Sequence, residues 1–179
     1  MIQLSRQDQY DIFENAISWI VVFGMLIYGA SKGVQFSNDA LPDKLVSEMT
    51  GMELMWSFYG YSKPFVLIVG ALEIIGGLLI LFKKTRLIGC FFTSPILINI
   101  ILQDYFYGVH WGALKAALIY QGILLLIIWL NRHQVVAGIK QVLLNSTTKI
   151  SGVLILKLGI AFVLFVIFRI GEYWMTIVW

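Results

Sequence analysis

Acid and amide side chains interrupt two of the most apolar stretches of the chain. Glu73 lies near the middle of one stretch, and Asn99, Gln103 and Asp104 lie in the second half of the next. A charged side chain at the centre of a bilayer costs at least about 2.5–3.5 kcal/mol on insertion scales. We therefore expect Glu73 to be neutral or paired with a cation. An acid can donate a proton and amides can hydrogen-bond carbonyl oxygens, so Glu73 is the candidate catalytic residue of a polar pocket.

Further candidate residues for ligand binding come from the ends of other apolar stretches, from about two turns beyond Lys115 inside the stretch at 111–130, and from an aromatic run at residues 52–61. They are Lys32, Lys115, Gln121, Trp56 and Tyr59. Either lysine could neutralise Glu73 by reaching inward. Two interpretations of the aromatic run remain open: a belt at the membrane interface, or a lid over a pocket between helices. The polar side chains also have a purely structural interpretation, as hydrogen bonds between helices worth less than about 2 kcal/mol each.

The elements that must hold these residues are apolar spans of about 20 residues, the length of a helix that crosses a hydrocarbon core of about 30 Å. We predict five of them, at about residues 15–32, 64–82, 87–107, 111–130 and 151–170. Uninterrupted apolar runs indicate helices and not the alternating strands of a barrel. The prediction is an all-α integral membrane helical bundle, a single transmembrane domain over residues 1–179. An outer segment spans residues 33–63, and a cytoplasmic connection spans residues 131–150.

The distribution of basic residues predicts the orientation of the bundle. With the N-terminus inside, seven basic residues fall in cytoplasmic segments: Arg6, Lys83, Lys84, Arg86, Arg132, Lys140 and Lys149. Four fall in outer segments: Lys32, Lys44, Lys63 and Lys115. Because Lys and Arg near span ends stay on the cytoplasmic side, we expect a multi-pass protein of a bacterial-type inner (plasma) membrane, N-in and C-out.

The composition excludes several classes of protein. The chain is 59% hydrophobic and 13% charged, too apolar for a water-soluble domain. Its formal net charge of +3 comes from basic residues at span ends, so we expect no nucleic-acid partner. A single cysteine, Cys90, excludes a thiol oxidase that exchanges disulfides through a cysteine pair. His110 and His133 are predicted on opposite sides of the membrane, so no metal site is expected.

Several short motifs, in order along the chain, carry a resemblance. They are residues 28–32 (YGASK), 53–62 (ELMWSFYGYS), 70–79 (GALEIIGGLL), 86–89 (RLIG) and 99–102 (NIIL), followed by aromatics at 105–107. Together they resemble the DoxX-like membrane protein family over about residues 12–130. The family is typically a four-helix membrane bundle, so the resemblance implies a four-helix core with a fifth, C-terminal transmembrane helix added. Asp104 departs from the pattern, since the family's third helix often has an asparagine there.

The resemblance also implies a redox association, because named members include a subunit linked to thiosulfate:quinone oxidoreduction. We expect a quinone-associated redox subunit with no covalently bound cofactor, possessing an intramembrane polar pocket for quinone. The sequence has no flavin, haem or iron–sulfur motif, so electrons would come from a membrane or peripheral redox partner or from substrate. Two alternatives stay open: a non-catalytic scaffold subunit of a membrane complex, and a small transporter or lipid-handling protein. The lipid bilayer is the expected environment, and homo-oligomerisation is left open.

Overall fold

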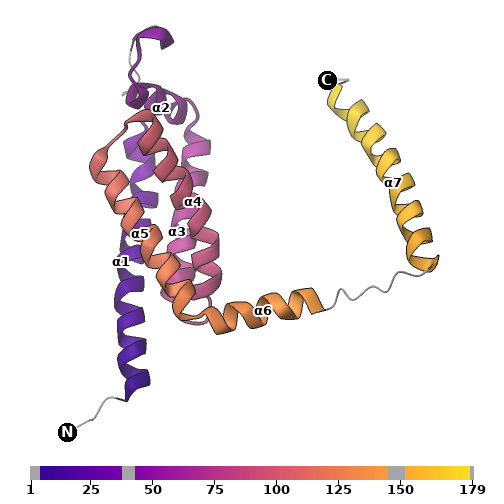
Figure 1. The fold of residues 1–179 in the computed structure, drawn as a ribbon. Coiled ribbons are helices and arrows are strands. Elements are labelled where there is room, and N and C mark those ends of the chain that lie inside the picture. Colours follow the sequence, from indigo (N-terminus) through magenta and orange to yellow (C-terminus); the bar gives the residue numbers. More distant parts are fainter. Residues whose placement is uncertain (1–4, 38–42, 145–151, 178–179) are drawn as a thin grey trace. The chain divides into compact units, whose positions relative to one another are not determined.

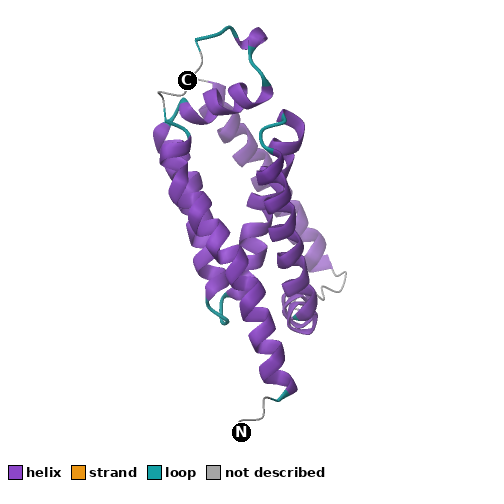
Figure 2. Cartoon of the chain, turned by 90° about the vertical axis from the view of Figure 1, so that its left-hand side faces the viewer, coloured by secondary structure: helices purple, strands orange, loops and turns teal. Residues whose placement is uncertain are grey.

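The computed structural model describes residues 5–37, 43–144 and 152–177, and in these ranges it contains helices and no strand (Figures 1 and 2). The described helices are α1 (Arg6–Gln35), the 3₁₀ turn η2 (Val46–Glu48), α2 (Gly51–Gly60), α3 (Lys63–Leu81), α4 (Arg86–Tyr107), α5 (Trp111–Leu130), α6 (Arg132–Leu144) and α7 (Gly152–Ile177). Five of them are long and apolar enough to cross a membrane: α1, α3, α4, α5 and α7. The predicted all-α membrane bundle is confirmed.

The first helix begins well before the predicted apolar span. Ser5 and Asp8 form a capping box, in which the Ser5 side chain accepts from the Asp8 N–H and the Asp8 carboxylate accepts from the Ser5 N–H. This arrangement satisfies backbone donors that the helix itself leaves free. The polar residues before the span are therefore helical, whereas the sequence analysis placed them outside the first element.

The chain divides into two compact units, Met1–His133 and Gln134–Trp179, where the sequence analysis treated it as one domain. In the first unit α1, α3, α4 and α5 form a closed four-helix arrangement. Each of these helices packs against two others, and α1 and α3 make the most extensive contact. In the second unit α7 is an apolar helix that carries an ion pair between Arg169 and Glu172, with Nη1 and Oε2 2.6 Å apart.

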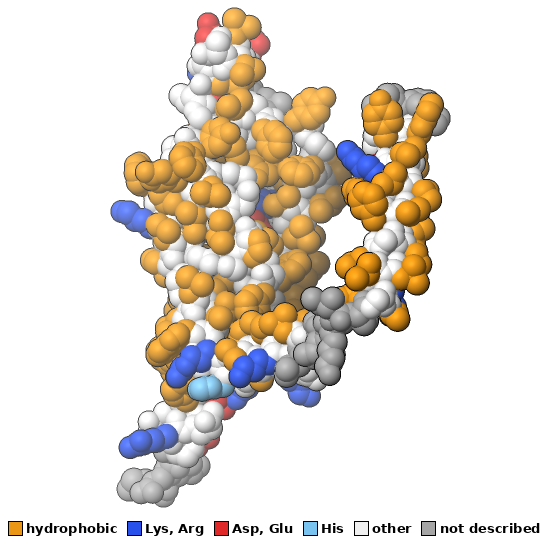
Figure 3. Space-filling view, turned by 45° about the vertical axis from the view of Figure 1, so that its right-hand side comes forward, with side chains coloured by type: hydrophobic (Ala, Val, Ile, Leu, Met, Phe, Trp, Pro, Cys, Tyr) orange, Lys and Arg blue, Asp and Glu red, His pale blue; other side chains and the backbone are white. Residues whose placement is uncertain are grey.

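The core of the four-helix bundle is apolar and comes from all four long helices. Its fully buried members include Met25 of α1, Ile80 of α3, Leu97 of α4 and Leu124 of α5. The flank of the bundle is covered mainly by apolar side chains, as Figure 3 shows. Apolar residues on both the inside and the outside are what lipid-exposed helices require, because lipid tails are as apolar as leucine.

Two glycines set the close approach of α1 and α3. A Cβ atom built at Gly29 would lie 2.5 Å from the carbonyl oxygen of Gly70, and one built at Gly70 would lie 2.5 Å from the carbonyl oxygen of Gly29. A side chain at either position would therefore push the two backbones apart. This contact lies close to the polar residues at one end of the bundle, since the Gly70 position also faces the Lys32 side chain.

The short helix α2 contacts α3 and α4 at the end of the bundle where α1 and α4 finish (Figure 1). We call this end the α2 end, and the opposite end, at residues 82–85 between α3 and α4, the turn end. Thr50 and Glu53 form a capping box that starts α2. Gly51 lies against the Tyr107 backbone so closely that a side chain would not fit. These contacts hold α2 to the end of α4.

Candidate functional site

A cavity of about 410 Å³ lies at the α2 end of the bundle. Residues of α1, α2, α4 and α5 line it, together with Phe36, Val109 and His110 just outside these helices. Its main polar lining residues are Tyr28, Ser31, Lys32, Gln35, Gln103, Asp104 and His110. Ligand sites in proteins are mostly apolar cavities of about 300–1,000 Å³ with a few convergent polar groups. This cavity has that size and that character.

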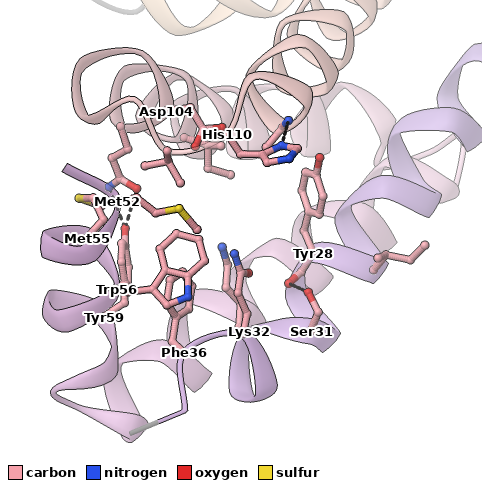
Figure 4. Close-up of a pocket in the computed structure, with 16 residues that line it drawn as sticks. Tyr28, Ser31, Lys32, Phe36, Met52, Met55, Trp56, Tyr59, Asp104 and His110 are labelled. Carbon is pink, nitrogen blue, oxygen red and sulfur yellow. Dashed lines mark hydrogen bonds between the residues drawn. The ribbon is translucent and has the colours of Figure 1, made fainter. Parts of the chain in front are cut away.

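Aromatic rings form one wall of the cavity (Figure 4). The ring of Phe36 lies 5.0 Å from that of Trp56 and 4.8 Å from that of Tyr59, centroid to centroid. Tyr59 also stacks on Phe65 at 5.9 Å. Aromatic pairs at such separations stabilise one another beyond the apolar area they bury. Residues of the run at 52–61 thus line the cavity, as the lid interpretation expects, and the interfacial-belt interpretation remains open.

Lys32 and Glu73 form an ion pair, with Nζ and Oε1 3.3 Å apart. Glu73 is fully buried, and it is not among the residues that line the cavity, whereas Lys32 is. The Cβ and Cγ atoms of Lys32 pass close to Gly70, whose missing side chain leaves room for them. Side chains tilt toward the N-terminus of their helix, so Lys32 reaches down α1 toward Glu73. The sequence left a neutral Glu73 and a pairing with Lys32 or Lys115 open, and the structure shows the pairing with Lys32.

Asp104 lies in the last turn of α4 and lines the cavity. Its side chain is 9% exposed, and no described group makes a hydrogen bond to its buried Oδ2 atom. Across the cavity from it lie Trp56 and Phe36 (Figure 4). Asp104 is therefore a buried acceptor that the described protein leaves unused.

His110 caps the start of α5. Its Nδ1 atom accepts a hydrogen bond from the Ala113 N–H at 3.1 Å, so in the neutral ring the proton is on Nε2. His110 is also a lining residue, and it contributes a donor beside Asp104. His110 was not among the candidate site residues predicted from the sequence.

Tyr59, Gln103 and Asn99 form a hydrogen-bonded chain between α2 and α4. The Tyr59 hydroxyl lies 3.0 Å from Oε1 and 2.7 Å from Nε2 of Gln103, and Nε2 also donates to Oδ1 of Asn99 at 2.6 Å. Burial raises the pKa of the Tyr59 phenol, so it remains a donor at neutral pH. The amide of Gln103 is thus taken up by protein partners. These hydrogen bonds of Gln103 hold α2 against α4.

Three predicted ligand-binding residues lie away from the cavity lining. Asn99 and Lys115 are exposed on the bundle surface, and Gln121 donates from Nε2 to the Ser94 hydroxyl at 2.6 Å. None of the three is among the lining residues. Counting residues along each span gives depth in the membrane. It gives no rotation about the helix axis accurate enough to separate the cavity from the lipid face.

A second buried polar cluster, at the turn end, was missed by the sequence analysis. Arg86 donates from Nη1 to Oε1 of Glu14 at 2.8 Å, from Nη2 to Oδ1 of Asn15 at 2.6 Å, and from Nε to the Ile80 carbonyl oxygen at 3.1 Å. Asn131 donates to the other Glu14 oxygen at 3.2 Å. The cluster joins α1, α3, α4 and the end of α5. In the sequence, Arg86 served as an orientation signal and as part of the RLIG motif, and Glu14 lies just before the first predicted span.

The described residues contain no group of three or more His, Cys, Asp or Glu side chains that could hold a metal ion. The cavity instead offers donors, one unused carboxylate oxygen and an aromatic wall. These features suit an organic ligand with a ring and polar oxygens.

The fold is a helical bundle of the membrane type, with the cavity described above at one end. The chain is similar to YwoB of Bacillus subtilis (strain 168), a protein described as uncharacterized, with 27% identity over 128 residues. The similarity covers 70% of this chain and 81% of YwoB. No family model matches the chain, and no solved structure matches it.

Proposed function

We propose that this protein is a quinone-associated subunit of a membrane redox system and that its α2-end cavity binds the quinone ring. The observation that carries the proposal is the composition of the cavity: an aromatic wall faces a small set of polar groups inside a membrane bundle. A quinone is a flat ring with two carbonyl oxygens, and it is soluble in the bilayer. The aromatic wall can pack against the flat ring, and the polar groups of the lining can hydrogen-bond the two carbonyl oxygens.

The flat ring would pack on Trp56 and Phe36, and the carbonyl oxygens would accept from donors of the lining. Those donors are the Lys32 ammonium, Nε2 of His110 and the Trp56 indole N–H. Lys32 is the group that would contact the ligand, and Glu73 would hold Lys32 in place from behind. This assignment differs from the sequence-based hypothesis, in which Glu73 itself met the quinone.

Reduction of a quinone to a hydroquinone consumes two electrons and two protons. We assign the electrons to a partner electron-transfer protein, because the sequence has no motif for a redox cofactor. Lys32 would stabilise the negative charge that develops on the ring oxygen as electrons arrive. The proposed setting is a bacterial-type plasma membrane. The turn end, with Lys83, Lys84 and Arg86, would face the cytoplasm.

The test is to fill the cavity and to measure quinone binding in nanodiscs. Ala113→Phe adds a ring to a lining position in the first turn of α5, while Leu118→Phe adds one on an exposed face of the same helix. Overpacking a cavity costs about 1–3 kcal/mol, so affinity for a short-tail quinone should fall about tenfold or more with Ala113→Phe. Leu118→Phe should bind like the parent. Absence of saturable binding to the parent protein, or equal binding by both variants, would contradict the proposal.

A further inference from the structure

We propose that Asp104 makes the cavity select the reduced, hydroxyl-bearing form of the quinone over the oxidised form. This inference rests on the proposed quinone function and names the redox state of the ligand that the site prefers. It starts from Asp104, a residue that lines the cavity and whose buried Oδ2 atom has no described hydrogen-bond partner.

The groups around Asp104 do not use up its acceptor capacity. Lys32 and His110 line the same cavity as Asp104. Lys32, however, is paired with Glu73, and no described donor hydrogen-bonds Oδ2 of Asp104. Buried polar groups are nearly always hydrogen-bonded, so an unused carboxylate on a residue that lines a cavity points to a donor supplied by a ligand.

The two redox forms of a quinone differ in whether they can donate a hydrogen bond to Asp104. The oxidised ring carries two carbonyl oxygens, which accept hydrogen bonds and would place a lone pair against the carboxylate. The reduced ring carries two hydroxyl groups, each of which can donate. An O–H bond to a carboxylate is charge-assisted and stronger than a bond between neutral groups.

The remaining donors of the cavity do not distinguish the two forms as sharply. The ammonium of Lys32, Nε2 of His110 and the indole N–H of Trp56 can each donate to a carbonyl oxygen or to a hydroxyl oxygen. Figure 4 shows Asp104 and His110 on one side of the cavity, and Trp56 and Lys32 on the other. A ring between them would have one oxygen near Asp104 and the other near the opposite donors.

A preference for the reduced form has a measurable redox consequence. The couple is quinone plus two electrons and two protons in equilibrium with hydroquinone, and the electrons come from the partner electron-transfer protein named above. Tighter binding of the product raises the midpoint potential of the bound couple. For two electrons, a tenfold ratio of affinities corresponds to about 30 mV.

The experiment measures affinity for both redox forms of one short-tail quinone, anaerobically, with the full chain in nanodiscs. The parent should bind the hydroquinone about tenfold more tightly than the quinone. Asp104→Leu removes the acceptor and Asp104→Asn removes the charge. Either change should bring the affinity ratio to within about twofold, because no internal hydrogen bond to Oδ2 is lost. Asp11→Asn, at the turn end, is the control and should keep the parent ratio.

The outcomes distinguish a failure of the role assigned to Asp104 from a failure of the proposed quinone function. If neither form binds the parent, the quinone function itself fails. If both forms bind equally, or if the ratio survives in both Asp104 variants, the quinone function stands and the role of Asp104 is wrong. Tighter binding of the oxidised form would mean that Asp104 donates a proton instead of accepting one, and would also overturn the inference.

Discussion

The buried ion pair at the turn end gives the sharpest stability prediction. Arg86 and Glu14 are respectively 3% and 9% exposed at their side chains, and they join the first helix to the fourth. Glu14→Leu leaves the Arg86 guanidinium buried and without its carboxylate partner. Arg86→Met leaves the carboxylate of Glu14 with Asn131 as its remaining donor. Each single change should therefore be strongly destabilising.

The expected size follows from the burial of the pair. Removing one partner of a buried ion pair costs about 3–5 kcal/mol, whereas replacing both by apolar residues is often neutral. We take the lower end, about 3 kcal/mol, because the pair lies at an end of the bundle and water can reach an uncompensated charge there. The double variant Glu14→Leu with Arg86→Met should cost less than the sum, with a coupling of at least about 2 kcal/mol.

Cys90 provides the assay. It is the one cysteine of the sequence, it is fully buried, and it lies one helical turn after Arg86 on α4. Local opening of the turn end should expose its thiol, so the rate of alkylation reports the opening free energy. A loss of about 3 kcal/mol corresponds to alkylation about 100-fold faster, and the double variant should react more slowly than either single one. Parent-like alkylation in both single variants would refute the reasoning.

Three further predictions concern the α2 end. Glu73→Leu should uncouple Lys32 and weaken quinone binding about tenfold, whereas Glu73→Gln, which keeps a polar contact, should lose less; equilibrium binding in nanodiscs measures both. Tyr59→Phe removes the bond to Gln103 and should increase deuterium uptake in α2 with little change in α5. The Lys44 ion pair and the Thr50 cap lower the pKa of Glu53 to about 2. The stability that this cap adds to α2 is thus fully present above about pH 4.5 and is lost as the pH falls through about 2. Trp56 fluorescence should report that loss in the parent. The fluorescence of Glu53→Gln should not change over the same pH range.

Span length and apolar content were enough to predict the bundle. The predicted spans at 64–82, 87–107 and 111–130 match α3, α4 and α5 within a residue at either end. The thickness of the hydrocarbon core fixes how many residues a crossing helix needs, so the positions of these three helices can be predicted from local composition. The beginning of α1 was harder, because a capping box extends the helix through polar residues.

The site was predicted in part. A cation partner for Glu73 was one expectation from the cost of an isolated acid in lipid, but the choice of Lys32 over Lys115 did not follow from the sequence. The aromatic run left a belt and a lid both open. The rotation of α4 did not follow, and it decides that Asp104 faces the cavity while Asn99 is exposed on the bundle surface. The Glu14–Arg86 pair is separated by 72 residues in sequence. Such a contact depends on how α1 and α4 pack, which no local pattern contains.

The central claim, that the α2-end cavity holds a quinone ring, is tested most directly by photocrosslinking in native membranes. A quinone analogue with a photoreactive group on its ring would be irradiated with the full chain, and the labelled peptides identified by mass spectrometry. We predict labels within residues 27–36, 52–59 and 100–113, which contain the residues that line the cavity, and loss of these labels in Ala113→Phe. Labels confined to the exposed flanks of α3 and α5, or no competition by unmodified quinone, would contradict the claim.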